Sequence, residues 1–213
     1  MEPREEILDV TARLFVERGF AGTSTREIAE AVGVRQASLY HYFAGKEGIL
    51  AELLQRSIRP TVDKIEKVEA LGAETGAGPD VLLNLLVVLD VRTLARAPRN
   101  AGVLTRLPEV ERKEAFEPFR VARDELEAAY ARIGEEVRAV GGAGVNYVPD
   151  GTLLGKQLLQ QVEVVIGMRS EGHPISSSIE SIVAASCLRI CLADQTRIDE
   201  AASRVADLIW ALE

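Results

Sequence analysis

The chain has 213 residues and a formal net charge of −8, with 47% hydrophobic and 27% charged residues. This ordinary globular balance excludes a disordered or fibrous chain, and the length allows one domain or a small domain joined to a larger one. No uncharged apolar stretch reaches the length of a membrane span. Two cysteines, Cys187 and Cys191, are too few for a disulfide framework, and the first residues lack a signal-peptide pattern. We therefore expect a cytoplasmic protein.

Helical spacing of apolar residues begins in the first 50 residues. The apolar side chains between residues 7 and 15 recur three and four positions apart, and Gly19 then predicts a helix end. Ser24-Thr25-Arg26-Glu27 has the form of a capping box, which predicts a second helix ending near residue 31. Gly33 supplies a turn before a third short helix at residues 36–42.

The remaining chain shows helical rather than strand periodicity. A fourth helix begins at Lys46 and is expected to bend or stop at Pro60. Residues 70–79, with three glycines and a proline, predict a loop, as do residues 141–150. Longer helices are predicted at residues 80–97, 118–140, 151–170, 176–192 and 197–212. The fold class is therefore all-α with about ten helices, divided into residues 1–48 and residues 49–213.

Two short helices joined by a tight turn, with a supporting helix on each side, form a helix-turn-helix unit. Over about residues 5–54 this unit resembles the DNA-binding domain of the TetR family of bacterial repressors, through the spacing Phe15-x-x-x-Gly19-Phe20-x-x-Thr23-Ser24-Thr25-x-x-Ile28-Ala29-x-x-Val32-Gly33-Val34-x-x-x-x-Leu39-Tyr40-x-Tyr42-Phe43-x-x-Lys46-Glu47-x-Ile49-Leu50. The resemblance implies a sequence-specific transcriptional regulator, a repressor, whose partner is double-stranded operator DNA. It also implies that residues 49–213 bind an effector and form a homodimer.

The physical chemistry of the unit agrees with such a role. Gly33 allows a left-handed turn without a side-chain clash. The third helix is short and carries polar or aromatic groups outwards, and a helix of this kind fits the major groove, where Gln bonds adenine and Arg bonds guanine. A small core beneath it is predicted from Ile28, Ala29, Val32 and Leu39, closed by Phe15 and Phe43.

Individual roles follow from the resemblance. Arg26 and Gln36 match base-reading positions, and Ala37 matches one that packs on thymine methyl groups. Arg35 stands where a small N-cap is usual, so we expect it to bind a base or a phosphate instead of capping the helix. The residues implied to contact DNA are Thr25, Arg26, Arg35, Gln36, Ala37, Ser38, Tyr40, His41, Tyr42 and Lys46. Three alternatives stay open: an Arg26–Glu30 surface pair, a Tyr40 ring that serves the core, and a Lys46 that merely opens its helix.

The resemblance also implies an effector cavity between the fourth helix and the helices after it. We expect a small, largely apolar ligand there that releases the protein from DNA. The candidate lining residues are Asn84, Leu85, Val88, Arg92, Phe116, Phe119, Tyr130, Gln157 and Gln161. The alternatives are a packed helical core without a cavity, and an Asn84 that bonds a neighbouring helix.

A homodimer is expected through the last two helices, because small residues there permit close helix packing. The candidate interface residues are Ala184, Cys187, Leu188, Cys191, Ala202, Val205 and Ile209. The alternative interface uses the helix at residues 151–170.

Catalytic and metal-binding patterns are absent from the sequence. His41 and His173 lie in unrelated segments without a spaced carboxylate partner. We therefore expect no enzyme, no metal and no cofactor, and a helical protein-binding adaptor is the remaining alternative. Cys187 and Cys191 are expected to be buried apolar residues rather than a thiol switch.

Overall fold

The computed structural model describes residues 2–141 and 150–212. Its regular elements within these residues are helices, as the periodicity predicts. The loop predicted at residues 141–150 falls mostly on positions 142–149, outside the described part. None of the described helices combines the length and the apolar character needed to cross a membrane.

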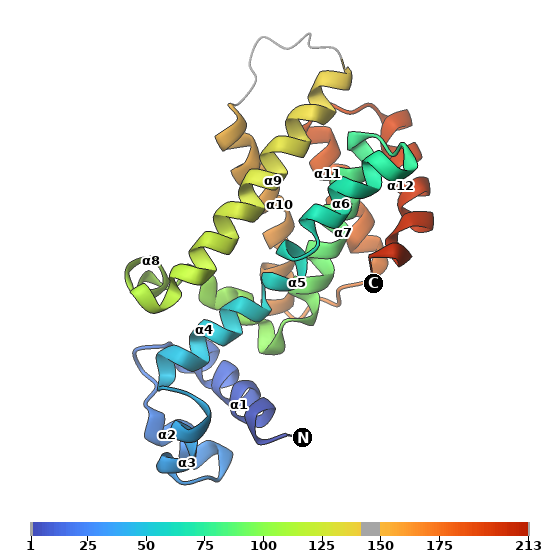
Figure 1. Ribbon diagram of the computed structural model, residues 1–213. Coiled ribbons are helices and arrows are strands. Elements are labelled where there is room, and N and C mark those ends of the chain that lie inside the picture. The colour runs from blue at the N-terminus through green and yellow to red at the C-terminus, as the bar shows by residue number, and fades with distance from the viewer. Residues whose placement is uncertain (1, 142–149, 213) are drawn as a thin grey trace.

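The helices form a small head and a larger body joined by α4 (Figure 1). The head holds α1 (Pro3–Arg18), α2 (Thr25–Val32) and α3 (Gln36–Tyr42), followed by α4 (Lys46–Arg56). The body holds α5 (Arg59–Val62), α6 (Ile65–Thr75), α7 (Pro79–Arg96), α8 (Pro108–Arg112), α9 (Glu117–Gly141), α10 (Gly151–Ser170), α11 (Ser177–Ile190) and α12 (Gln195–Leu208). Three 3-10 helices complete the chain: η1 (Pro98–Arg106), η2 (Glu114–Phe116) and η3 (Ile209–Ala211).

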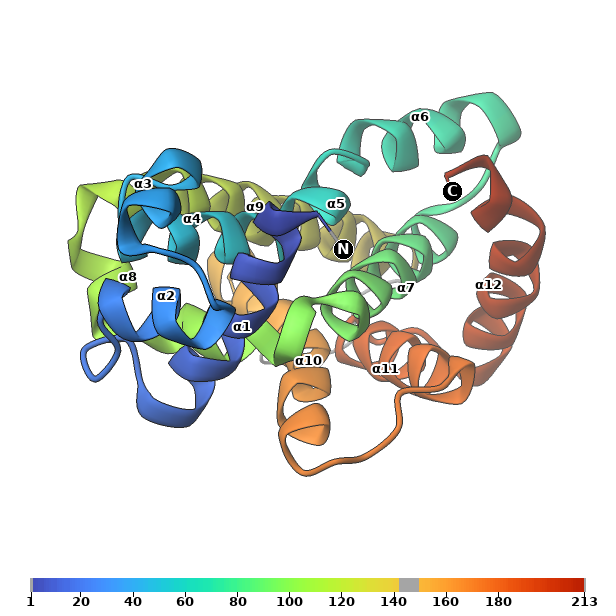
Figure 2. The same cartoon turned by 90° about the horizontal axis from the view of Figure 1, so that it is seen from below.

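Helix α7 forms the centre of the body. Nearly all of its residues from Val81 to Leu94 are buried, because α5, α6, α9, α10, α11 and α12 all pack against it. Figure 2 shows α7 running between these helices when the molecule is seen from below. A helix that is apolar on every face needs neighbours on every side, and the fold supplies them.

Helices α9 and α10 pack most closely where glycine removes a side chain. A Cβ atom on Gly155 of α10 would lie 2.5 Å from the carbonyl oxygen of Glu127. A Cβ atom on Gly134 of α9 would lie 2.9 Å from Leu158. The absence of side chains at both positions lets the two helices approach along their length.

Prolines begin helices here rather than interrupt them. Pro60 lies in the first turn of α5, and Pro98 and Pro108 lie in the first turns of η1 and α8. The chain between residues 98 and 116, for which the sequence predicted no helix, is therefore a series of short helices. The loop predicted at residues 70–79 is wrong in its first half, because α6 continues to Thr75 with Val68 and Leu71 buried.

The head and body share one continuous apolar core. Helix α1 packs along η1, and α4 contacts η1, η2 and α9. At the junction the ring of Phe20 meets the ring of Phe116 edge-on at 6.3 Å. Lys113 also donates a hydrogen bond to Glu47 at 2.8 Å across the same boundary. The proposed division at residue 48 is therefore a boundary in the sequence, but the side chains on its two sides pack into one core.

Candidate functional site

The crossing of α2 and α3 is fixed by local interactions that the sequence predicts. The hydroxyl of Ser24 accepts a hydrogen bond from the Glu27 backbone, and the Glu27 carboxylate accepts one from the Ser24 backbone at 2.8 Å. Hydrogen bonds from Ser24 to the carboxylate lower the pKa of Glu27. Gly33 ends α2 in the left-handed conformation with φ 80°. The capping box and the glycine turn are both as predicted.

The core between the two helices contains the predicted side chains. Ile28, Ala29 and Leu39 are buried, and Phe15 and Phe43 close the core on either side, whereas Val32 is half-buried. The sequence reasoning missed Phe20, whose ring lies 5.2 Å from that of Phe15. Its place after the Gly19 turn gave no sign that it faces the core.

Most of the predicted DNA-contacting residues lie on α3 and the start of α2, whereas Arg35 is the N-cap of α3 and Lys46 begins α4. Their side chains are exposed except for Thr25 and Lys46, which are half-buried; the exposed ones are Arg26, Arg35, Gln36, Ala37, Ser38, Tyr40, His41 and Tyr42. Tyr40 keeps 52% of its surface exposed, so its ring is not a core residue. Arg35 stands at the N-cap of α3 without a side-chain capping bond, as its size led us to expect.

Hydrogen bonds between side chains hold part of this surface in place. Gln36 Nε2 donates to the Thr25 hydroxyl at 2.9 Å, and the Tyr40 hydroxyl lies 3.3 Å from the same oxygen. The three side chains connect the N-terminus of α2 with the exposed face of α3. Their positions are therefore coupled, and Gln36 is held where an adenine edge in a major groove could replace Thr25 as its partner.

Arg26 and Lys46 have partners within the chain. Arg26 forms the surface pair with Glu30, at 2.8 Å, that the sequence left as an alternative. Lys46 Nζ donates to the carbonyl oxygens of Phe20 and Thr23 at 2.8 and 2.9 Å and lies 4.5 Å from the centre of the Phe20 ring. Lys46 thus ties the loop before α2 to α4, and at most one of its three donors remains for a phosphate.

Paired arginines attach α1 to α4. Arg56 binds the Glu5 carboxylate through two hydrogen bonds of 2.7 Å and also reaches Glu52 at 2.8 Å. Arg4 donates to both carboxylate oxygens of Glu52 and shares Oε1 with Arg56. The hydrogen bonds from the Arg56 guanidinium group lower the pKa of Glu5. The supporting helix of the head is therefore held to the helix that leads into the body.

The residues predicted to line an effector cavity do not converge on one site. Six of them are buried, namely Asn84, Leu85, Val88, Phe116, Phe119 and Tyr130; Arg92 and Gln161 are half-buried and Gln157 is exposed. Phe116 packs beneath Phe20 of the head instead of facing a cavity. Arg92 pairs with Glu180 of α11 at 3.1 Å.

A small void lies among the helices of the body. A void of about 20 Å³ lies between the turn after α4, α7, η1, α9 and α10, with Asp90, Phe119, Arg123 and Glu163 among its lining residues. Outside it, a groove of about 650 Å³ is open to the surface between α9 and α10. A void of this size holds a single water molecule, so a drug-sized effector would need these helices to move apart.

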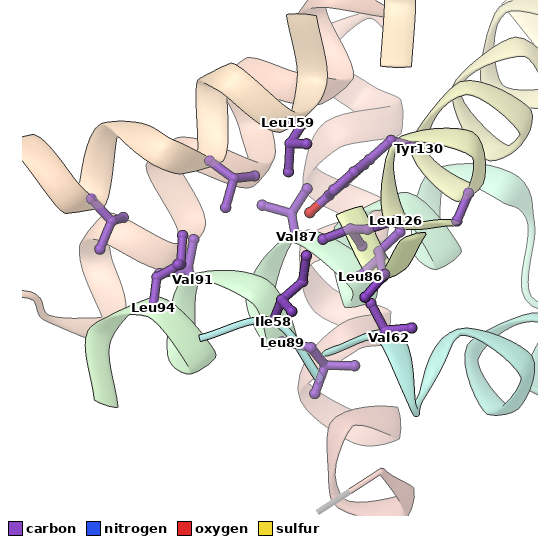
Figure 3. Close-up of a cluster of buried hydrophobic side chains, with 14 of the residues drawn as sticks. Ile58, Val62, Leu86, Val87, Leu89, Val91, Leu94, Leu126, Tyr130 and Leu159 are labelled. Carbon is purple, nitrogen blue, oxygen red and sulfur yellow. The ribbon is translucent and has the colours of Figure 1, made fainter. Parts of the chain in front are cut away.

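Polar groups meet beside the void in an otherwise apolar core. The Tyr130 hydroxyl donates to Asp90 Oδ2 at 3.0 Å, and the Thr61 hydroxyl lies 3.3 Å from Oδ1. Figure 3 shows Tyr130 extending among the apolar side chains of α7, with its hydroxyl oxygen near Val87. Burial raises the pKa of Asp90 to about 7.

Most of the predicted dimer residues face the inside of the protomer. Six are buried within the chain, Ala184, Cys187, Leu188, Cys191, Val205 and Ile209, and only Ala202 is exposed. The reason is that α11 and α12 turn these faces towards α7. These side chains are covered within the protomer, so an interface through α11 and α12 would have to use other residues of these helices. Burial raises the pKa of both thiols, to about 12 for Cys191, which fits buried apolar residues.

Comparison with known proteins agrees with this architecture. Residues 7–53 match the model of the family described as bacterial regulatory proteins, tetR family. The chain is 38% identical over 80 residues to the HTH-type transcriptional repressor KstR2 of Rhodococcus jostii. That alignment spans 38% of this chain and only 39% of the repressor, and the alignment with KstR2 of Mycobacterium tuberculosis spans 26% of that protein.

Two further likenesses extend over most of the chain. The nucleoid occlusion factor SlmA of Vibrio cholerae is 31% identical over 170 residues, covering 75% of this chain and 80% of that protein. The crystal structure of Mycobacterium smegmatis AmtR superposes with a TM-score of 0.80 at 34% identity, covering 95% of this chain and 94% of that one. Since the likeness includes both head and body, the chain belongs to the TetR family of bacterial regulatory proteins.

Proposed function

We propose that this protein is a transcriptional repressor that binds an operator as a homodimer and is released from it by a small ligand. The observation that carries the DNA-binding part is the exposed face of α3, where Gln36 and Tyr40 are joined through Thr25. The body is acidic overall, so binding depends on this one face and on the helix N-termini near it.

The test of DNA binding is a band-shift assay with the DNA upstream of the gene. Changing Gln36 and Tyr40 together to Ala should abolish specific binding, while circular dichroism and the oligomeric state stay unchanged, because both side chains are exposed. Glu200→Ala, an exposed change on α12, is the matched control and should bind like the wild type. Unchanged operator affinity in the double variant would show that α3 does not read the DNA.

The dimer is proposed to form through α10 and α11. Helix α10 is the alternative interface helix of the sequence analysis. Val164 of α10 keeps 44% and Ile182 of α11 keeps 59% of its surface exposed, and such aliphatic side chains gain by burial against a second copy. Two heads on one dimer could then reach half-sites about 34–36 Å apart.

Sedimentation at micromolar concentration tests this interface. The wild type should be a dimer, and Val164→Glu combined with Ile182→Glu should be a folded monomer that has lost operator binding. Ala202→Glu on α12 is the control and should remain dimeric. Dimerisation of the double variant and dissociation of the control would together assign the interface to α12.

Release by a ligand is proposed to act through the void beside Asp90. A ligand that separates α9 and α10 would favour a conformation in which the two recognition helices no longer match successive major grooves. A coupling of about 1–3 kcal/mol would weaken operator binding about 5–150-fold. Operator titrations with and without a bound ligand measure that coupling directly.

A further inference from the structure

Two side chains are common to the lining of the void and of the outer groove. Arg123 and Leu159 line both the void of about 20 Å³ and the groove of about 650 Å³. Leu159 is buried, whereas Arg123 reaches inwards from α9 and keeps 30% of its side chain exposed. A rotation of Arg123 would therefore join the two spaces.

Arg123 is held in place by a buried carboxylate. Its guanidinium group donates to Glu163 of α10, and only 5% of the Glu163 side chain is exposed. Arg106 of η1 lies 3.6 Å from the other oxygen of Glu163, but 67% of its side chain is exposed. Removing a cation from a buried carboxylate is costly, so Arg123 can leave only if another cation takes its place.

Asp90 also lines the void, and within residues 2–141 and 150–212 its hydrogen-bond partners are hydroxyl groups rather than cations. Its two oxygens meet the hydroxyl groups of Tyr130 and Thr61, and it is 2% exposed. The residues that line the void therefore include two carboxyl groups, of Asp90 and Glu163, and one guanidinium group, that of Arg123. Burial opposes the charged form of Asp90, so a ligand that brings a positive charge and hydrogen-bond donors to this carboxyl group would stabilise that form.

We propose that the effector of this protein carries a protonated amine or a similar cation, which replaces Arg123 at Glu163 and reaches Asp90, while its apolar part occupies the groove. This proposal rests on the ligand-controlled function given above and names the chemical class of the ligand. The apolar groove lining includes Leu153, Leu159 and Ile190. Since Ile190 belongs to α11, a second protomer on the α10–α11 face would help to shield the bound molecule from water.

Contacts around Glu163 also connect the proposed ligand site with the DNA-binding head. Arg106, which faces Glu163, belongs to η1, and η1 packs along α1. Asn100 of η1 also donates hydrogen bonds to Ile166 and Ser170 of α10 at 2.8 Å. A ligand that moves α10 at Glu163 would therefore displace η1 and, with it, the supporting helix of the head.

The experiment compares three probes that share one carbon chain and differ in charge: hexylammonium, hexanoate and hexan-1-ol. Thermal unfolding of the full-length protein without DNA is measured with each probe. At about ten times its Kd, hexylammonium should raise the Tm of the wild type by about 3–6 °C, and hexanoate should not raise it. A larger effect of hexanoate, or no effect of hexylammonium on wild type and Arg123→Ala alike, would overturn the proposal.

Variants test the position of the cation. Arg123→Ala would join void and groove and leave Glu163 with only the exposed Arg106 as its partner, so it should bind hexylammonium more tightly than the wild type does. Glu163→Gln and Asp90→Asn should each weaken that binding at least tenfold while binding hexan-1-ol normally. Asp199→Asn, an exposed change on α12, is the control and should behave like the wild type.

An unchanged hexylammonium affinity in both carboxyl variants would place the cation elsewhere and refute the assignment. The band shift of the ligand-free wild type is recorded separately. Its failure would count against the repressor function alone, whereas failure of the probe experiment would count against the ligand class alone.

Discussion

Replacing Asp90 by Asn should change how the stability of the protein depends on pH. The pKa of Asp90 is about 7 in the folded chain, against 3.8 as its ordinary value, because burial opposes the charged form. Between these two pH values the folded chain holds a proton that the unfolded chain releases. The stability that this proton provides is fully present below pH 4 and is lost as the pH rises through 7.

The size of the effect follows from the shift. About 3 pKa units correspond to about 4 kcal/mol in total, of which about 2–3 kcal/mol falls between pH 5 and pH 8. Asn keeps the shape of Asp without titrating. The free energy of unfolding of the wild type, relative to that of Asp90→Asn, should therefore fall by about 2–3 kcal/mol over that interval.

Urea denaturation followed by circular dichroism at pH 5, 6, 7 and 8 measures this difference at one protein concentration. Glu5 and Glu47 have lowered pKa values, so they act in the opposite direction, but they contribute equally to both proteins and cancel. Tyr130→Phe removes a hydrogen bond that lowers the pKa of Asp90, so the midpoint should move to higher pH. The reasoning would be refuted if the free energy of unfolding of the wild type, relative to that of Asp90→Asn, stayed constant or rose between pH 5 and pH 8.

Three further predictions concern packing and reactivity. Gly155→Val should cost more than about 2 kcal/mol of unfolding free energy in urea titrations, because its Cβ would meet the Glu127 carbonyl at 2.5 Å, whereas Gly167→Val, with no atom within 4 Å, should cost less. Lys46→Met should lower the Tm as well as operator affinity, because Lys46 holds the Phe20 and Thr23 carbonyls; loss of affinity at unchanged Tm would instead indicate a pure phosphate contact. Cys187 and Cys191 should react with a thiol reagent only at the rate of unfolding, and rapid labelling of the folded protein would contradict their burial.

Much of the head could be predicted because its determinants are close together in the sequence. The capping box joins Ser24 and Glu27, three positions apart, and the left-handed Gly33 follows directly from the end of α2. The exposed face of α3 also follows from helical spacing. By contrast, nothing near Glu5 in the sequence marks Arg56 as its partner 51 residues away.

Some predictions for the body failed because the apolar periodicity of a helix shows which of its faces is buried but not which element covers that face. The apolar faces that include Leu188 and Val205 are buried as expected, yet α7 of the same chain covers them instead of a second copy. The 3-10 helix η1 was missed because it is short and begins at Pro98, a residue type that more often marks the end of a helix. Tyr130 and Asp90 lie 40 residues apart in the sequence, and only the fold brings them together.

The contact of Phe20 with Phe116 determines how far the head can be treated as an exchangeable module. The aromatic core of the DNA-binding unit is completed by a side chain nearly a hundred residues further along, and Lys113 covers the same ring at 5.2 Å. A chimaera that joins residues 1–48 to the body of another regulator would leave this ring against a surface that did not evolve with it. A chimaera keeps this contact only when the segment around residues 113–116 is transferred together with the head.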